Sequence, residues 1–181
     1  MEKIKGNNCV YTEVPIGLTR CKHRDPEKTP AQPIFAERCE GTVEMFPEFI
    51  RGPKDIEGFS HLILVYRLHR AESELLTVTP LLDTKKRGVF STRCPLRPNR
   101  IGISVVRLLG RKGGVLRVQG VDTLDRTPIL DIKPYVTKFD SVPHARCGRF
   151  ETIDAKTWKK EALKECEPRT APWSGRRASK A

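Results

Sequence analysis

Arginine is concentrated in one short segment whose backbone is stiffened by proline. Residues 93–100 read Arg-Cys-Pro-Leu-Arg-Pro-Asn-Arg, so three guanidinium groups stand on a loop that Pro95 and Pro98 restrict. A planar guanidinium pairs with phosphate or carboxylate through parallel hydrogen bonds, and a restricted loop loses less entropy on binding. We therefore expect this loop to bind an anion. The alternative is an ordinary solvated loop.

A second candidate is the segment 129–135, where polar and apolar residues alternate. Asp131, Lys133 and Tyr135 share one face of an expected strand, and Leu130 and Ile132 take the other. An acid, an amine and a phenol in one row bind a polar ligand or move a proton. The solvated face of a half-buried sheet explains the same pattern equally well.

Several familiar sites are absent from the sequence. No two glycines stand two residues apart and no Gly-Lys pair occurs, which excludes a Rossmann fingerprint and a P-loop. The segments 58–62 and 102–106 each lack the second glycine of a nucleophile elbow. Cys21 and His23 with His144 and Cys147 offer two sulfurs and two nitrogens, but their spacing is not that of common zinc modules. We expect ordinary thiols and no metal.

The charge of the whole chain favours a polyanionic partner. Its 181 residues carry a net charge of +12, and residues 84–112 contain nine basic residues and no acidic one. Such an excess attracts nucleic acid, although a generally basic proteome would also produce it. No 18-residue apolar run is present and no apolar segment follows the first charges, so we expect neither a membrane span nor a secretory signal. These features predict a cytoplasmic protein.

The elements that must position these residues read mainly as strands. We expect a short strand within 10–18 and further strands at 40–46, 59–68, 102–109, 115–121 and 128–136, with a hairpin turn at 110–114. The segment 59–68 is apolar on both faces, which is typical of a central strand. Because little room is left for crossover helices, the pattern predicts a mainly β fold, a compact antiparallel barrel over residues 1–150.

The last thirty residues differ from the rest. Asp154 is a candidate N-cap, and Trp158, Ala162, Leu163 and Cys166 follow at helical spacing. Residues 168–181 then hold four basic residues and no acidic one among prolines and glycine. We predict that 151–181 form a short amphipathic helix that docks on the barrel, followed by a basic tail.

Three segments resemble the signatures of one family. Residues 88–104, Gly-Val-Phe-Ser-Thr-Arg-Cys-Pro-Leu-Arg-Pro-Asn-Arg-Ile-Gly-Ile-Ser, are similar to a signature of the TsaA/YaeB (TrmO-type) family. Leu-Asp-Arg-Thr-Pro at 124–128 with Leu-Asp-Ile-Lys-Pro-Tyr-Val at 130–136 resembles the second signature, and Gly-Phe-Ser-His-Leu at 58–62 the third. The resemblance covers residues 16–140, in the family's order.

The resemblance implies a compact non-Rossmann β-barrel that binds S-adenosylmethionine, as a homodimer. Members of the family methylate the exocyclic nitrogen of threonylcarbamoyladenosine beside the anticodon of tRNA. Four positions depart from the family's pattern: Ala31, Cys94, Arg100 and Arg126 stand where arginine, serine, proline and glycine are usual. Carried onto this sequence, the cofactor contacts are Pro30, Ala31, Gln32, His69, Arg70, Arg93, Ile103, Leu124, Asp125, Arg126 and Thr127.

The same reading assigns roles to the remaining candidates. A sulfonium methyl is already activated, so transfer needs orientation and dryness more than a protein nucleophile. The acceptor nitrogen must lose a proton, for which we predict Tyr135 or Asp131 as catalytic residue, or else solvent. Arg97, Arg100 and Lys133 are the predicted substrate-binding residues. A non-catalytic S-adenosylmethionine or RNA-binding module, or a methyltransferase for another acceptor, remains an alternative.

Overall fold

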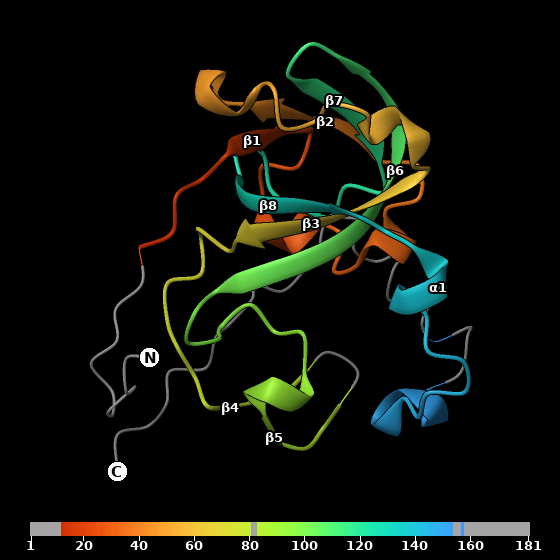
Figure 1. Cartoon of the computed structure of the whole chain (residues 1–181). Helices are drawn as coiled ribbons and strands as arrows, with labels where there is room; N and C mark the ends of the chain where they lie inside the picture. Colours follow the sequence, from red (N-terminus) through yellow and green to blue (C-terminus); the bar gives the residue numbers. More distant parts are fainter. Residues whose placement is uncertain (1–11, 81–82, 154–156, 158–181) are drawn as a thin grey trace, which may run out of the picture.

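The computed structural model describes residues 12–80, 83–153 and 157, and its centre is a closed antiparallel β-barrel (Figure 1). Around the barrel the strands follow the order β1, β2, β7, β6, β3, β8, and β8 pairs again with β1. The predicted mainly β, antiparallel fold class is thus confirmed. The strands of the barrel are β1 (Gly17–Arg20), β2 (Glu40–Met45), β3 (His61–Arg67), β6 (Ile101–Lys112), β7 (Val115–Gln119) and β8 (Pro128–Pro134).

The core of the barrel follows from the period of two along its strands. In β3, Leu62, Leu64 and Tyr66 point inward and are almost completely buried, whereas the residues between them are half-buried on the outer face. β3 pairs with β6 on one side and β8 on the other, which confirms it as the central strand that its two apolar faces predict. The interior is filled by Val43, Leu62, Leu64, Tyr66, Val106, Leu116, Val118, Val121 and Ile129.

Two strands, β1 and β6, differ in extent from the sequence-based expectation. β1 spans Gly17–Arg20, so it begins near the end of the expected range 10–18 and continues two residues beyond it; the earliest part of that range lies outside the described residues. β6 continues through the expected turn to Lys112, so the hairpin turns only at Gly113 and Gly114. The expected turn at 110–114 was wrong in its first three residues. Gly110, with φ of 155°, forms an irregularity within the ladder instead of ending the strand.

A bulge in β8 changes which residues face inward. Val65 pairs with Asp131 but Tyr66 pairs with Ile129, so one residue of β8 has no partner across the ladder. Ile129, on one side of the bulge, and Ile132, on the other, therefore both point into the core. From Asp131 onward the predicted alternation holds.

One end of the barrel is closed by the connection between β7 and β8, residues 120–127. Thr19 on β1 is 1% exposed and anchors this connection: its Oγ1 donates to the carbonyl of Leu124 at 3.0 Å and accepts from the backbone N–H of Thr127 at 3.1 Å. The backbone N–H of Arg126 also donates to the carbonyl of Thr19 at 2.8 Å. The connection is thus a fixed lid on the barrel.

The chain between β3 and β6 leaves the barrel and forms a small second sheet below it (Figure 1). That sheet pairs β4 (Thr77–Val78) with β5 (Arg87–Gly88), and the 3-10 helix η6 (Val89–Ser91) follows. The arginine-rich loop then leads into β6. The other helices are η2 (Pro26–Lys28), η3 (Pro33–Phe35), η4 (Pro47–Phe49), η5 (Ile56–Gly58), α1 (Thr137–Asp140) and η7 (Gly148–Thr152).

The predicted C-terminal helix and basic tail fall almost wholly outside the described residues, which end at 153 apart from 157. The proposed division at residue 150 and the helix with Asp154 as N-cap therefore stay predictions. Within the described part of the chain, no helix has the length and apolar character needed to cross a membrane.

Candidate functional site

A cavity of about 280 Å³ opens at the lidded end of the barrel. Two of its lining residues, His69 and Arg70, come two and three residues after the end of β3, and two, Asp125 and Arg126, belong to the lid. All four are predicted cofactor contacts, so the fold brings together segments far apart in the sequence. The fifth lining residue, Arg24, was not predicted, because it lies in an irregular segment without a motif.

The cavity is strongly cationic. Asp125 is 7% exposed, accepts a hydrogen bond from the backbone N–H of Cys21 at 3.1 Å, and forms an ion pair with Arg24. Partial burial and then the neighbouring Arg70 lower the pKa of His69, so its imidazole is neutral at pH 7. In the described part of the chain, neither Arg70 nor Arg126 forms an ion pair. Two guanidinium charges are left uncompensated.

A second group of predicted contacts lies where residues 30–32 meet the arginine-rich loop. Nη1 of Arg93 donates to Oε1 of Gln32 at 2.6 Å, across 61 residues of sequence. Pro30 is buried and Ala31 is exposed. Leu124 and Thr127 lie in the lid, where both the hydroxyl of Thr127 and that of Thr19 donate to the carbonyl of Leu124. These residues shape the lid through their backbone.

Beneath this site runs a buried polar chain that the sequence did not reveal. Oγ of Ser104 donates to Oδ1 of Asp122 at 2.6 Å, and the hydroxyl of Tyr66 lies 3.0 Å from the same Oγ. Because the single hydrogen of Ser104 is directed to the carboxylate, Tyr66 is the donor to Ser104. Tyr66, Ser104 and Asp122 are 7%, 2% and 9% exposed.

Burial is the largest influence on the pKa values of Asp122 and Tyr66. It raises the pKa of Asp122 to about 6, while the hydrogen bond from Ser104 and the charge of Arg93 act in the opposite direction. Burial and the nearby Asp122 also raise the pKa of Tyr66, which therefore stays a neutral phenol. The sequence signal for these hydrogen-bonded side chains was Tyr66, because a tyrosine on an inward face needs a partner for its hydroxyl.

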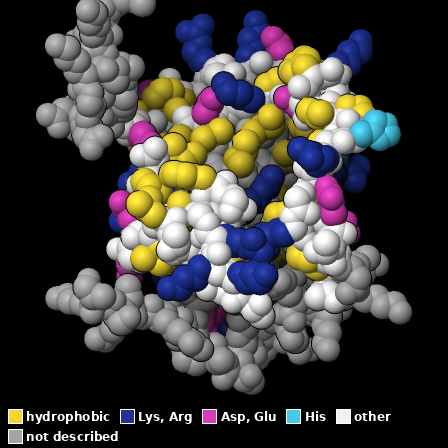
Figure 2. Space-filling view, turned by 90° about the horizontal axis from the view of Figure 1, so that it is seen from below, with side chains coloured by type: hydrophobic (Ala, Val, Ile, Leu, Met, Phe, Trp, Pro, Cys, Tyr) yellow, Lys and Arg dark blue, Asp and Glu magenta, His cyan; other side chains and the backbone are white. Residues whose placement is uncertain are grey.

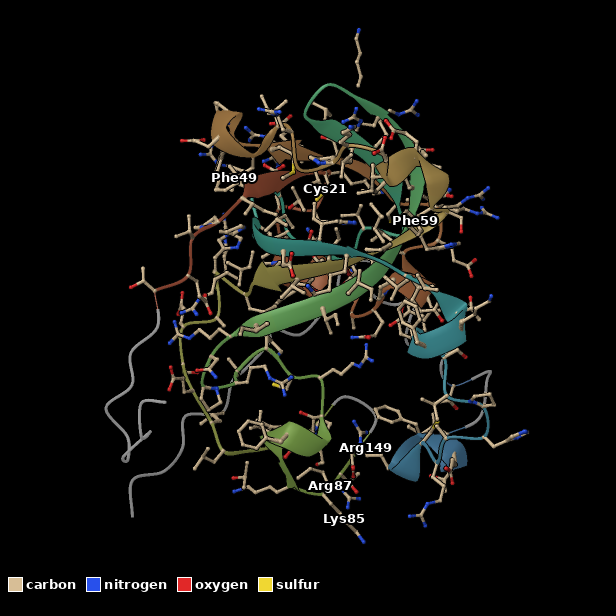
Figure 3. All side chains as sticks on the ribbon, viewed as in Figure 1. Cys21, Phe49, Phe59, Lys85, Arg87 and Arg149 are labelled. Carbon is tan, nitrogen blue, oxygen red and sulfur yellow. The ribbon has the colours of Figure 1, made fainter. Side chains whose placement is uncertain are left out.

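The arginine-rich loop does not project all its guanidinium groups freely. Nη1 of Arg97 makes a long contact of 3.5 Å with the carbonyl of Thr92, and Nη2 of Arg100 lies 3.5 Å from Glu74. The basic stretch is also divided in space, because Arg87 on β5 and Lys85, in the bend before that strand, lie below the barrel (Figure 3). Arg87 is paired there with Asp83 at 2.9 Å.

The other predicted residues lie on the outer wall of the barrel. Asp131 and Lys133 form an ion pair of 2.7 Å on the outer face of β8. Tyr135 donates its backbone N–H to the carbonyl of His61, at the start of β3, whereas His69 and Arg70 follow the end of that strand. Within one chain the structure therefore does not bring Tyr135 to the cavity. Ile103 is 53% exposed on the outer face of β6.

The pair of candidate metal ligands near the lid is used otherwise. Sγ of Cys21 donates to the carbonyl of Thr123 at 3.2 Å, and Nε2 of His23 donates to the carbonyl of Val121 at 3.1 Å. Burial raises the pKa of Cys21 and lowers that of His23, which keeps both groups neutral. The described residues contain no cluster of three or more side chains suited to a metal ion.

A closed barrel without a Rossmann fold, with a cationic cavity at its lidded end, defines the class of protein. The chain belongs to the tRNA-methyltransferase O N-terminal domain family, whose model matches residues 18–141.

Individual relatives agree with this family. A "Probable S-adenosyl-L-methionine-binding protein" of Pyrococcus abyssi is 54% identical over 76% of this chain and 74% of its own length. The mouse tRNA (adenine(37)-N6)-methyltransferase is 35% identical over 70% of this chain but only 31% of its own length. A crystal structure of TrmO from Pseudomonas aeruginosa matches with a TM-score of 0.67 at 39% identity, over 78% of this chain and 63% of that one. This chain thus spans just under two thirds of that structure.

Proposed function

We propose that this protein is an S-adenosylmethionine-dependent tRNA methyltransferase that methylates the exocyclic nitrogen of threonylcarbamoyladenosine beside the anticodon. The observation that carries the proposal is the convergence of His69, Arg70, Asp125 and Arg126 on one cavity in a member of this family. The P. abyssi relative's name supports the cofactor, and the mouse relative's name supports tRNA adenosine as the acceptor.

The residues of the cavity fit the proposed methyl donor. The amino-acid part of S-adenosylmethionine carries a carboxylate and an ammonium group, and the cavity wall offers charges of both signs in Arg70 and Asp125. Gln32 and Arg93 would hold the donor from the other side of the lid. When bound, the donor supplies an activated methyl group, so the protein's own task is to orient the acceptor and exclude water.

The proton of the acceptor nitrogen needs a base, and the predicted candidates Asp131 and Tyr135 imply a second chain. Neither lies at the cavity within one chain, and Asp131 is paired with Lys133. Both stay proposals, tested by Asp131→Asn and Tyr135→Phe. If both variants fold and keep near-normal turnover, neither residue is the proton acceptor.

The outer wall of the barrel supports the proposed homodimer. Ile103 and Val105 on β6 are 53% and 38% exposed, and their partners across the ladder are Val65 and Ile63. Asp131 pairs with the same Val65, so the charged pair borders this apolar face. Figure 2, seen from below the barrel, shows hydrophobic side chains gathered beside a group of Lys and Arg. A second copy of the chain would cover such a face.

Ile103 is a predicted contact of the methyl donor, yet it points outward from the barrel. A position in the dimer interface would explain how it could still contact the donor. We expect Ile103→Glu to be monomeric in sedimentation experiments and to bind the donor at least about tenfold more weakly, since a charge in an apolar interface is strongly unfavourable. Val142→Glu, at an exposed residue after α1, is the control and should sediment like the wild type. A dimeric Ile103→Glu protein would refute this interface.

The proposed activity has a direct test. The protein is incubated with methyl-labelled S-adenosylmethionine and with tRNA that carries or lacks the threonylcarbamoyl group, and the tRNA is digested to nucleosides. We expect label and a mass gain of one methyl only in threonylcarbamoyladenosine. Cofactor binding without transfer would favour a non-catalytic binding module, and transfer to unmodified tRNA or without tRNA would indicate another acceptor.

A further inference from the structure

The charge of the cavity exceeds what the methyl donor requires. Three guanidinium groups face one carboxylate, and that carboxylate is already paired with Arg24. The neutral imidazole of His69 adds no charge of either sign. S-adenosylmethionine carries a sulfonium, an ammonium and one carboxylate, so its binding adds further positive charge to the cavity. The excess of positive charge therefore favours the approach of an anion from another molecule.

Arg126 is the cation best placed to receive that anion. It lies in the lid and is exposed, and in the described part of the chain its side chain has no ion pair. Its backbone is in the left-handed region, with φ of 61°. Arginine has no local hydrogen bond that favours this region, unlike asparagine or aspartate.

The strained backbone at Arg126 is imposed by its surroundings. The N–H of Arg126 donates to the carbonyl of Thr19 at 2.8 Å, and the N–H of Asp125 donates to the carbonyl of His23 at 2.7 Å. Glycine would adopt this conformation without strain. An arginine here therefore lowers stability without any compensating contact within the described residues, which is typical of a residue that serves binding.

We propose that the side chain of Arg126 binds an anionic group of the acceptor tRNA, beside the methyl donor. The inference rests on the proposed function above and makes Arg126 a specificity-determining residue of that site. The shared chemistry is an oxyanion that accepts charge-assisted hydrogen bonds from the guanidinium. In the acceptor it is either the carboxylate of the threonylcarbamoyl group or a phosphate of the anticodon arm.

The test compares two variants of Arg126 with a control that removes the same charge elsewhere. Arg126→Gly removes the guanidinium and the strain, and Arg126→Asn removes the guanidinium while tolerating the left-handed conformation. Arg51→Asn is the control, because Arg51 is exposed and lies far from the cavity. It stands in a turn beside η4, and its neighbour Ile50 packs on the hairpin of β6 and β7, at the other end of the barrel. Binding is measured by filter retention of tRNA with and without threonylcarbamoyladenosine, and donor binding by calorimetry.

We expect both Arg126 variants to bind threonylcarbamoylated tRNA about tenfold more weakly than the wild type and the Arg51→Asn control. Any loss of donor affinity should be smaller than the loss of tRNA affinity, and Arg126→Gly should melt at least as high as the wild type, which a merely structural residue would not do. A loss confined to the threonylcarbamoylated tRNA identifies the carboxylate, and an equal loss for both tRNAs identifies a phosphate.

Other results overturn the inference. The inference fails if the Arg126 variants bind tRNA as tightly as Arg51→Asn, or if they lose affinity for the donor alone. It also fails if the wild-type protein has no measurable affinity for either tRNA. Failure of the proposed function is separate, because it appears as the absence of methyl transfer by the wild type, whereas these measurements follow binding.

Discussion

At the scale of single residues, Asp122 is a carboxyl group whose ionisation the fold opposes. Burial in the barrel raises its pKa from 3.8 to about 6, although Ser104 and Arg93 favour the charged form. Because the folded state holds the proton more tightly than the unfolded chain, it binds more protons between these two values. This group therefore makes the protein more stable below pH 4 than above pH 6.

Replacing Asp122 should remove that pH dependence. The unfolding free energy of the wild type should contain a decrease of about 2 kcal/mol as the pH rises from 4 to 6, which Asp122→Asn lacks. The amide oxygen still accepts the hydrogen bond from Ser104, so the variant keeps its packing. Urea unfolding of both proteins at several pH values measures the difference, and parallel curves would show that Asp122 is not the titrating group.

Gly102 fixes the position of Tyr66 at the other end of the buried chain. A Cβ atom at residue 102 would overlap the ring of Tyr66, whereas one at Gly88 would meet nothing within 4 Å. We expect Gly102→Ala to lower the unfolding free energy by about 2 kcal/mol through overpacking, and the control Gly88→Ala to leave it nearly unchanged. Chemical denaturation decides between them, and equal stabilities would mean that the ring shifts freely.

Site residues differ in how far a sequence can reveal them. His69, Arg70, Asp125 and Arg126 stand in motifs, and they do meet at the cavity. Arg24 could not be predicted in the same way, because its place there depends on an ion pair across about a hundred residues of sequence. Asp122 likewise becomes unusual only through burial in three dimensions.

At the scale of elements, the lid depends on one side chain of β1. The hydroxyl of Thr19 takes part in three hydrogen bonds with residues 123–127. Valine has the same shape but no hydroxyl, so Thr19→Val would leave the backbone N–H of Thr127 without its acceptor. Thr19→Val should lower stability by about 2 kcal/mol. Because the lid carries Asp125 and Arg126, donor affinity should fall as well.

Thr42 on β2 provides the matched control for this threonine. It is half-buried, and in the described part of the chain its side chain makes no hydrogen bond. Thr42→Val should change neither the melting temperature nor donor binding measured by calorimetry. Should Thr19→Val behave like Thr42→Val, the lid is held by its backbone alone.

The elements themselves were predictable where a period of two continues without interruption. β2 and β3 match their apolar patterns almost residue for residue. β8 and β6 depart from expectation at a bulge and at Gly110, because a one-residue irregularity depends on the partner strand rather than on local sequence. The closure of the barrel by β1 and β8 also depends on long-range pairing.

At the scale of the whole molecule, the net charge of +12 is spread over several surfaces. Arg111 and Arg117 on the hairpin of β6 and β7 are paired with Glu57 and Glu40, and Arg87 on the small sheet is paired with Asp83. The unpaired cations of the cavity, by contrast, face a concave surface. Charge content alone predicted a polyanionic partner, but only the fold distinguishes compensated arginines from those available for binding.

Arg97 provides a last prediction about tRNA binding. Among the residues that the structure describes, its guanidinium has only a long contact to the carbonyl of Thr92, which leaves most of its donors available to phosphate. Each neutralised phosphate releases counterions, so the logarithm of tRNA affinity should fall linearly with that of salt concentration. Arg97→Ala should reduce this slope by about 1, whereas Arg51→Ala should leave it unchanged. Filter binding between about 50 and 200 mM salt measures the slope. An unchanged slope for Arg97→Ala would place the phosphate contacts on other arginines and leave Arg97 as a residue that braces its own loop.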